Sequence, residues 1–181
     1  LEFDNMFSYG EDNVVDFTKL SGIVGIFAPN ASGKSSLLDA LSFCLFDTSS
    51  RAYKAINVLN NKKDRFSCKA TIEVQGKEYV IERKGKKGRA GHVKVDVDFY
   101  TFADDGEKVS LNGDQRRTTD VNIRKVIGTY DDFIMTAISL QTNSTVFIDK
   151  TQKERKDLLA QFMGVGVFDQ LYTLAADDIH E

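Results

Sequence analysis

The sequence predicts an α/β protein in which a strand, loop and helix near the N-terminus precede an antiparallel sheet and a helical C-terminal part. Three observations carry this prediction. A short apolar run at 22–27 leads into a glycine-containing loop and a helical repeat of leucines, residues 66–74 alternate apolar with polar side chains, and helical spacing takes over after about Thr118. With 181 residues, of which 41% are hydrophobic, the chain is long enough to form one globular core.

Composition narrows the class of protein. Lys and Arg number 24 against 27 Asp and Glu, a net charge of -3, which argues against binding nucleic acid by bulk charge alone. No apolar run approaches the roughly 18 residues that span a bilayer, and the N-terminus has no secretion signal. We therefore expect an intracellular protein without a membrane partner, cytoplasmic in a prokaryote or virus and nuclear in a eukaryote. Because the chain starts at Leu1 and stops at Glu181 inside a helical pattern, we expect it to be a piece of a longer protein.

The N-terminal third predicts a hairpin and then a strand, a loop and a helix. Residues 1–17 fit two short strands around a polar turn at 8–13, and 22–27 fits a strand buried in the middle of a sheet. After the loop, apolar side chains recur at helical spacing and form one stripe: Leu37, Leu38, Leu41, Cys44 and Leu45.

The middle third predicts antiparallel strands. Residues 66–74 alternate, Gly76 and Lys77 turn the chain back into 79–83, and a strand at 93–99 pairs with 109–111 through a turn at 104–106. Cys44 and Cys68 form no CxxC pair, so we expect small buried residues in a reducing compartment rather than metal ligands.

The C-terminal part predicts helices at 122–127 and 131–140. Thr151 and Glu154 form a capping box that opens a third helix, and Gly164 and Gly166 end it. A last amphipathic helix follows, with apolar side chains at Phe168, Leu171, Tyr172, Leu174, Ala175 and Ile179.

Ala28 to Ser35 have the spacing of a phosphate-binding loop, the Walker A pattern, between a strand and a helix. Backbone N–H groups and the positive end of the helix dipole would face the phosphates. Lys34 would reach the β- and γ-phosphates as a catalytic residue, and the Ser35 hydroxyl would bind magnesium. The sequence thus predicts ATP and Mg²⁺ as cofactors. The residues expected to bind the nucleotide are Asn30, Ala31, Ser32, Gly33, Lys34, Ser35 and Ser36.

Two alanines and a missing acid limit this prediction. Ala28 is tolerable if it does not need a positive φ, whereas Ala31 replaces a glycine beside the phosphates and adds a methyl group without removing an N–H donor. The chain has no apolar strand ending in Asp-Glu that could hold magnesium and activate water. It has no Ser-Gly-Gly segment either. We expect the chain by itself to bind nucleotide poorly and to hydrolyse it barely or not at all.

Three segments together resemble one family. "APNASGKSSLLDALSFCLFD" is similar to the start of structural-maintenance-of-chromosomes-type (SMC-type) ATPases, and "NMFSYGEDNVVDF" looks like their first hairpin. "DDFIMTAISLQTNSTVFIDKTQKERKDLLAQFMGVGVFDQL" resembles the Q-loop and following helices of the DNA-repair ATPase SbcC and its counterpart Rad-fifty. The resemblance covers nearly the whole chain, although Thr142 stands where that family's Q-loop often has Gly.

The resemblance implies an ABC-type ATPase head that is split by a long coiled coil. It implies an N-terminal lobe at 1–166, with the phosphate loop at 28–35, an antiparallel sheet beside a parallel core, and the start of the outgoing coiled-coil helix at 167–181. Gln141 would be the Q-loop residue that contacts magnesium and senses the γ-phosphate, a second catalytic residue. The implied partners are the C-terminal half of the same protein, a second copy of the head, an SbcD-type metallo-nuclease and double-stranded DNA.

A basic segment lies between two predicted strands. "RKGKKGRAGHVK", from Arg83 to Lys94, has six cations, three glycines and no acid, and it predicts a mobile loop. Two interpretations stay open. One is a solvated edge that blocks sheet pairing. The other is contact with the DNA phosphate backbone through Lys84, Lys86, Lys87 and Arg89.

Other classes of protein that contain a phosphate-binding loop are alternatives to an SbcC-like ATPase head. A chromosome-organising SMC head or a RecF- or RecN-like protein would differ mainly in its hinge, its coil and what it binds. A transporter-type ATPase would show its signature and second acidic strand within this length, and a small kinase would need an acceptor site and lid arginines. The sequence contains none of these patterns.

Overall fold

The computed structural model describes residues 1–52, 54–138, 148, 150–163, 165, 168, 171 and 172. The chain divides into two compact units, Leu1–Tyr130 and Asp131–Glu181. Among the described residues, no helix is long and apolar enough to cross a bilayer.

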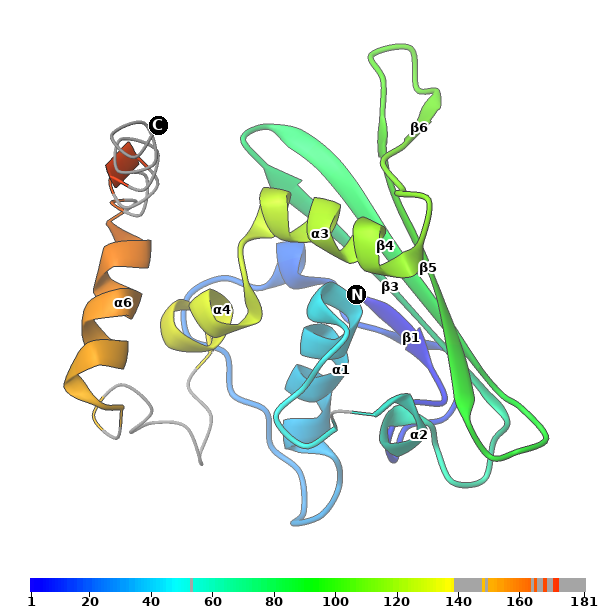
Figure 1. The fold of residues 1–181 in the computed structure, drawn as a ribbon. Helices are drawn as coiled ribbons and strands as arrows, with labels where there is room; N and C mark the ends of the chain where they lie inside the picture. Colours follow the sequence, from blue (N-terminus) through cyan, green and yellow to red (C-terminus); the bar gives the residue numbers. More distant parts are fainter. Residues whose placement is uncertain are drawn as a thin grey trace. The chain divides into compact units, whose positions relative to one another are not determined.

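One six-stranded antiparallel sheet organises the first unit, in the order β2-β1-β3-β4-β5-β6 (Figure 1). Its strands are β1 (Glu2–Asp4), β2 (Asn13–Val14), β3 (Arg65–Val74), β4 (Lys77–Lys87), β5 (Val93–Phe102) and β6 (Lys108–Ser110). The predicted N-terminal hairpin and the predicted central strands are confirmed. They form one sheet, because Phe3 of β1 pairs with Cys68 of β3.

Helices α1 (Lys34–Phe46) and α3 (Arg116–Ile127) cover the same face of this sheet. The Phe66 ring of β3 packs edge-on against Phe43 of α1, with ring centroids 5.6 Å apart. On α3, Ile123 is buried. Two short helices, η1 (Phe17–Lys19) and α2 (Ala55–Val58), lie in the connections. Helix α3 begins six residues before the predicted helix at 122–127. The sequence pattern missed these first turns because they are polar and carry no apolar repeat.

The buried face of α1 differs from the predicted leucine stripe. Ala40, Phe43 and Cys44 are buried, whereas Leu37, Leu38 and Leu41 are only half-buried. The small side chains at positions 40 and 44 let the helix approach the sheet closely, and the Cys44 Sγ–H donates to the carbonyl oxygen of Ile81 at 3.7 Å. The predicted stripe is therefore confirmed at Cys44 and Leu45, which are buried, and wrong for the three half-buried leucines, although the helix is confirmed.

Both cysteines behave as the sequence predicted. Cys44 and Cys68 are free and buried. Burial, followed by the neighbouring Cys44 thiol, raises the pKa of Cys68 well above its ordinary value. The raised pKa keeps the Cys68 thiol protonated at neutral pH, so it is not a reactive thiolate.

The predicted buried strand at 22–27 is wrong for this chain. The segment forms no strand, and Ile23 and Phe27 are 104% and 95% exposed. An apolar run forms a strand only when neighbouring strands accept its hydrogen bonds and cover its faces, and among the described residues no strand pairs with it. The described sheet is antiparallel throughout, so the expected parallel core is not formed there.

The second unit contains α6 (Gln152–Phe162), and α4 (Tyr130–Thr136) begins at the boundary between the units. The capping box of α6 is confirmed: the Thr151 backbone N–H donates to Glu154 Oε2 at 2.7 Å, and the Glu154 backbone N–H donates to Thr151 Oγ1 at 3.4 Å. Helix α4 is shorter than the predicted 131–140, whose last two residues lie outside the described part. Most of 167–181 also lies outside it, so the outgoing coiled-coil helix stays a prediction.

Candidate nucleotide-phosphate site

The phosphate loop ends where α1 begins. Gly33 is the residue before the helix and has φ +98°, a left-handed conformation that favours glycine. No side chain caps this end, and the backbone N–H groups of Lys34, Ser35 and Ser36 have no hydrogen-bond partner among the described residues. Three such amides at the positive end of a 13-residue helix could donate hydrogen bonds to a phosphate oxygen.

Lys34 folds back over the loop. Its Nζ donates to the carbonyl oxygens of Ala28 at 2.7 Å and Pro29 at 2.8 Å. The ammonium group therefore lies on the same loop as the free amides, and a phosphate bound there would receive both charge and hydrogen bonds. The sequence-predicted residues from Asn30 to Ser36 are brought together as a continuous loop and helix start.

The two alanines of the loop differ in conformation. Ala28 has no positive φ, which confirms that alanine is tolerable there. Ala31 has φ +63°, so its Cβ lies in a conformation that disfavours L-residues. The cost at position 31 is therefore backbone strain as well as a crowded methyl group.

Ser35 lies one residue inside the helix, with an exposed side chain that leaves its hydroxyl accessible for a cation beside the phosphates. Gln141, the predicted second ligand of magnesium, lies outside the described residues. Within the described part, no cluster of three or more His, Cys, Asp or Glu could hold a metal ion by itself. The donor set fits a cation that arrives with the nucleotide phosphates better than a metal held by the protein alone.

A family model described as an AAA domain matches residues 1–171. The chain belongs to the AAA domain family.

Three relatives place this AAA domain more closely. It is 38% identical to an uncharacterised protein of Acanthamoeba polyphaga mimivirus over 100% of the chain and 14% of that protein. It is 28% identical to the SbcC component of the nuclease SbcCD of Bacillus subtilis over 91% of the chain and 15% of the relative. It is 24% identical to "DNA double-strand break repair Rad50 ATPase" of Methanococcus maripaludis over 86% of the chain and 14% of the relative.

These matches agree with a divergent N-terminal half of the SbcC/Rad50 type. The chain spans about one-seventh of the length of each of these relatives, 14% to 15%.

The basic segment of this AAA domain is largely strand rather than mobile loop. Strand β4 continues to Lys87, β5 begins at Val93, and the turn between them is closed by a hydrogen bond from the Gly88 N–H to the His92 carbonyl oxygen at 2.8 Å. Lys84 and Lys86 project from the face opposite α1, and Lys87 and Arg89 are exposed at the end of the hairpin. The four predicted DNA contacts therefore lie together at one end of the sheet.

Arg83 does not belong with them. It is fully buried, donates from Nε to the Cys44 carbonyl oxygen at 2.8 Å, and pairs through NH2 with Asp120 at 2.9 Å. The alternation of β4 explains this, because Arg83 has the same phase as the buried Ile81 and Gly85.

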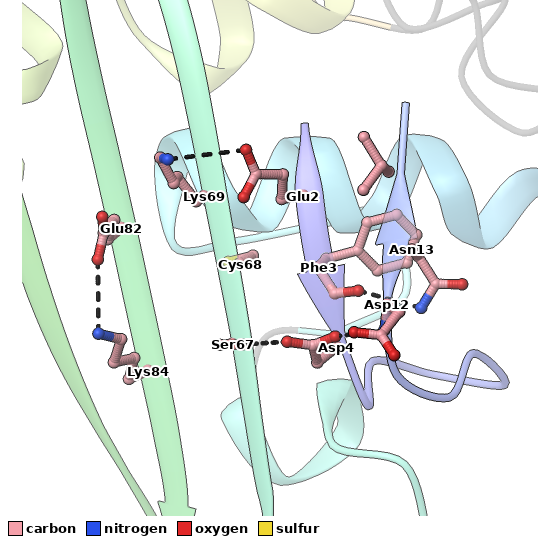
Figure 2. A pocket seen from close by; sticks show the side chains of 11 residues that line it. Glu2, Phe3, Asp4, Asp12, Asn13, Ser67, Cys68, Lys69, Glu82 and Lys84 are labelled. Atoms are coloured by element: carbon pink, nitrogen blue, oxygen red, sulfur yellow. Dashed lines mark hydrogen bonds and ion pairs between the residues drawn. The ribbon is translucent and has the colours of Figure 1, made fainter. Parts of the chain in front are cut away.

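A pocket of about 250 Å³ lies on the outer face between β1, β2, β3 and β4 (Figure 2). Its polar side chains pair with one another: Lys69 with Glu2 at 3.6 Å, Lys84 with Glu82 at 3.5 Å, and Ser67 with Asp4 at 2.9 Å. Because these charges compensate one another, the phosphate loop remains the candidate site.

Proposed function

We propose that this chain is the N-terminal half of an ATPase head that binds Mg-ATP and acts in DNA double-strand-break repair or DNA end processing. The observation that carries the proposal is at the start of α1, where three backbone amides have no hydrogen-bond partner within the described part of the chain and the Lys34 ammonium is folded over the same loop. Similarity to SbcC and Rad50 supports the choice of pathway.

The exposed apolar segment supports completion of the head by a second half. Ile23 and Phe27 are almost fully exposed, and exposed apolar runs of this kind mark surfaces that a partner covers. We propose that the C-terminal half of the same protein supplies strands on either side of 22–27 and so forms the parallel core. That half would also carry the acidic residue that this chain lacks, and the helix at 167–181 would lead to it through a coiled coil.

The residues of this chain bind and orient the nucleotide. Lys34 and the α1 amides hold the phosphates, the Ser35 hydroxyl faces the magnesium ion, and Gln141 takes the role that the family resemblance implies. Bound Mg-ATP supplies the phosphoryl group that water attacks. The nucleotide lies between two copies of the head, and a nuclease of the SbcD type is the expected partner.

The basic hairpin is the proposed DNA contact. Lys86 lies directly between Arg65 of β3 and Lys94 of β5 in the register of the sheet. Like charges directly opposite one another destabilise a sheet. Arg65 and Lys94 pair with Asp64 and Asp96, whereas Lys86 has no acidic partner among the described residues, so a bound polyanion would supply one. Contacts of this kind recognise the phosphate backbone without regard to sequence.

The nucleotide proposal is tested by co-expressing this chain with the C-terminal half of the full-length protein. Titration calorimetry should show magnesium-dependent ATP binding, and light scattering should show ATP-induced dimerisation. Lys34→Ala should abolish both, because it removes the phosphate-facing charge. Wild-type protein that neither binds ATP nor dimerises contradicts the proposal.

The DNA proposal is tested on the same assembled protein. Replacing Lys84, Lys86, Lys87 and Arg89 with Gln should weaken binding to a DNA duplex and flatten its salt dependence, by about 0.9 in the log-log slope for each DNA phosphate that is no longer neutralised. A matched control replaces four exposed lysines elsewhere: Lys19, Lys54, Lys77 and Lys125. Equal effects of the two quadruple variants would count against a role for the hairpin.

A further inference from the structure

The tip of the β1–β2 hairpin touches Gly33 of the phosphate loop, the residue before α1. The Tyr9 hydroxyl donates to the Gly33 carbonyl oxygen at 3.0 Å. A Cβ at position 33 would lie 2.7 Å from Ser8 Oγ and 3.3 Å from a ring carbon of Tyr9. The side chains of the hairpin tip therefore pack directly against Gly33, the residue that precedes α1.

Tyr9 is itself held firmly. Its ring packs edge-on against Phe3 with centroids 5.1 Å apart. Its backbone N–H donates to the Met6 carbonyl oxygen at 2.9 Å, and its carbonyl oxygen accepts from Asn60 Nδ2 at 2.9 Å. Because the ring and the backbone of Tyr9 are both held in place, its hydroxyl can fix the position of the Gly33 carbonyl that it binds.

The hairpin tip carries backbone strain. Asn5, Phe7 and Asp12 are non-glycine residues with φ between +51° and +61°. Such conformations persist only where surrounding contacts enforce them, and the Phe7 N–H, for example, donates to the Val58 carbonyl oxygen at 2.6 Å. Contacts that maintain this strained tip also keep Tyr9 directed at Gly33.

The contact acts on the amide that faces the phosphates. The Gly33–Lys34 peptide is planar and trans, so its N–H points opposite to its carbonyl. With the carbonyl held toward Tyr9, the Lys34 N–H is directed away from the hairpin, as one of the three free amides at the helix start. The other hydrogen bond to this carbonyl, from the Leu37 N–H, is longer at 3.3 Å, so Tyr9 is the stronger restraint on the plane.

We propose that Tyr9 is a positioning residue for nucleotide binding, which orients the Gly33–Lys34 peptide so that the Lys34 N–H meets a phosphate oxygen. The inference rests on the proposed function. It assigns to the hairpin a role in phosphate binding that acts through the backbone rather than through contact with the ligand.

The test is Tyr9→Phe in the full protein with both halves of the head. The ring and its packing on Phe3 remain, and only the hydroxyl is lost. The expected result is about a fivefold rise in the Kd for Mg-ATP and Mg-ADP and in the KM for ATP, with kcat unchanged, since one restraint on one hydrogen-bond donor is removed. The matched control is Tyr79→Phe, whose ring stacks on Phe99 at 5.9 Å and whose hydroxyl has no hydrogen-bond partner within the described part.

The outcomes separate positioning from stability. If Tyr9 had only a structural role, Tyr9→Phe would reduce the fraction of folded protein. The measured kcat would then fall at constant KM, and the melting temperature would fall below that of Tyr79→Phe. That result overturns the inference. Nucleotide affinity equal to wild type also overturns it. If wild-type protein binds no Mg-ATP, the proposed function itself fails, a result that is distinct from a failure confined to Tyr9→Phe.

Discussion

Arg83, in the middle of β4, donates from Nε to the carbonyl oxygen of Cys44 in the last turns of α1 at 2.8 Å. The same guanidinium pairs with Asp120 of α3 at 2.9 Å, so one side chain joins the sheet to both helices that cover it. Because α1 begins at the phosphate loop, this contact anchors the far end of the helix that carries the candidate site.

Arg83→Met should destabilise the protein by about 3 kcal/mol or more. The change leaves Asp120 and two helix carbonyls without their buried partner, and removing one member of a buried ion pair is costly. Equilibrium unfolding in urea measures the loss. The control is Lys84→Met, the next residue on the opposite face, which is 73% exposed and should change stability by less than about 0.5 kcal/mol. Similar losses in the two variants would contradict a structural role for Arg83.

Ala31→Gly and Ala28→Gly should have opposite effects on stability. Glycine at 31 relieves the strain of φ +63° and should stabilise the folded chain by about 0.5–1 kcal/mol. Glycine at 28, where φ is not positive, mainly adds freedom to the unfolded chain and should destabilise by about the same amount. Thermal and chemical unfolding of both variants provide the comparison, and changes of the same sign would show that strain at Ala31 is not the deciding term.

Gly85→Ala should destabilise the protein by about 1–3 kcal/mol. A Cβ at position 85 would overlap the Phe66 ring, which is buried and packed against Phe43, so the whole ring must move. The measurement is the free energy of unfolding in urea. Gly88→Ala is the control, because its added Cβ would meet its nearest neighbour at an ordinary 3.6 Å. A double variant with Phe66→Leu should recover part of the loss if the ring is the cause.

The capping box of α6 should weaken at acidic pH. Hydrogen bonds from the Thr151 hydroxyl and backbone hold the pKa of Glu154 below its ordinary value of 4.5. A depressed pKa in the folded state means that the stabilisation is present above pH 4.5 and is lost as pH falls through the folded-state pKa. Amide hydrogen exchange in the first turn of α6 should therefore lose protection below that pH.

Glu154→Gln supplies the control for this pH dependence. Its amide oxygen can still accept from Thr151 but does not titrate, so protection in the first turn should be lower at neutral pH and flat on acidification. Thr151→Ala should lower protection at every pH, by about 1 kcal/mol for the lost cap. A wild-type profile that parallels the Gln variant would contradict the assignment to Glu154.

Local patterns in the sequence predicted most of the elements. The alternation in β3 depends on a period-two backbone, and the capping box depends on two residues three positions apart, so neither needs distant contacts. The phosphate-loop pattern was recognisable for the same reason, because Gly33, Lys34 and Ser35 are adjacent in the chain. The sequence by itself therefore determined the family, the antiparallel strands and the loop at the candidate site.

Tertiary structure decided what depends on neighbours. Whether 22–27 forms a strand depends on which strands pair with it. Which face of α1 is buried depends on where small side chains let the helix approach the sheet. Arg83 became a buried anchor, and Tyr9 came to lie against Gly33, because residues far apart in the sequence meet only in the folded chain. Periodicity and spacing describe short stretches, whereas burial, ion pairing and the orientation of one peptide plane are properties of the packed whole.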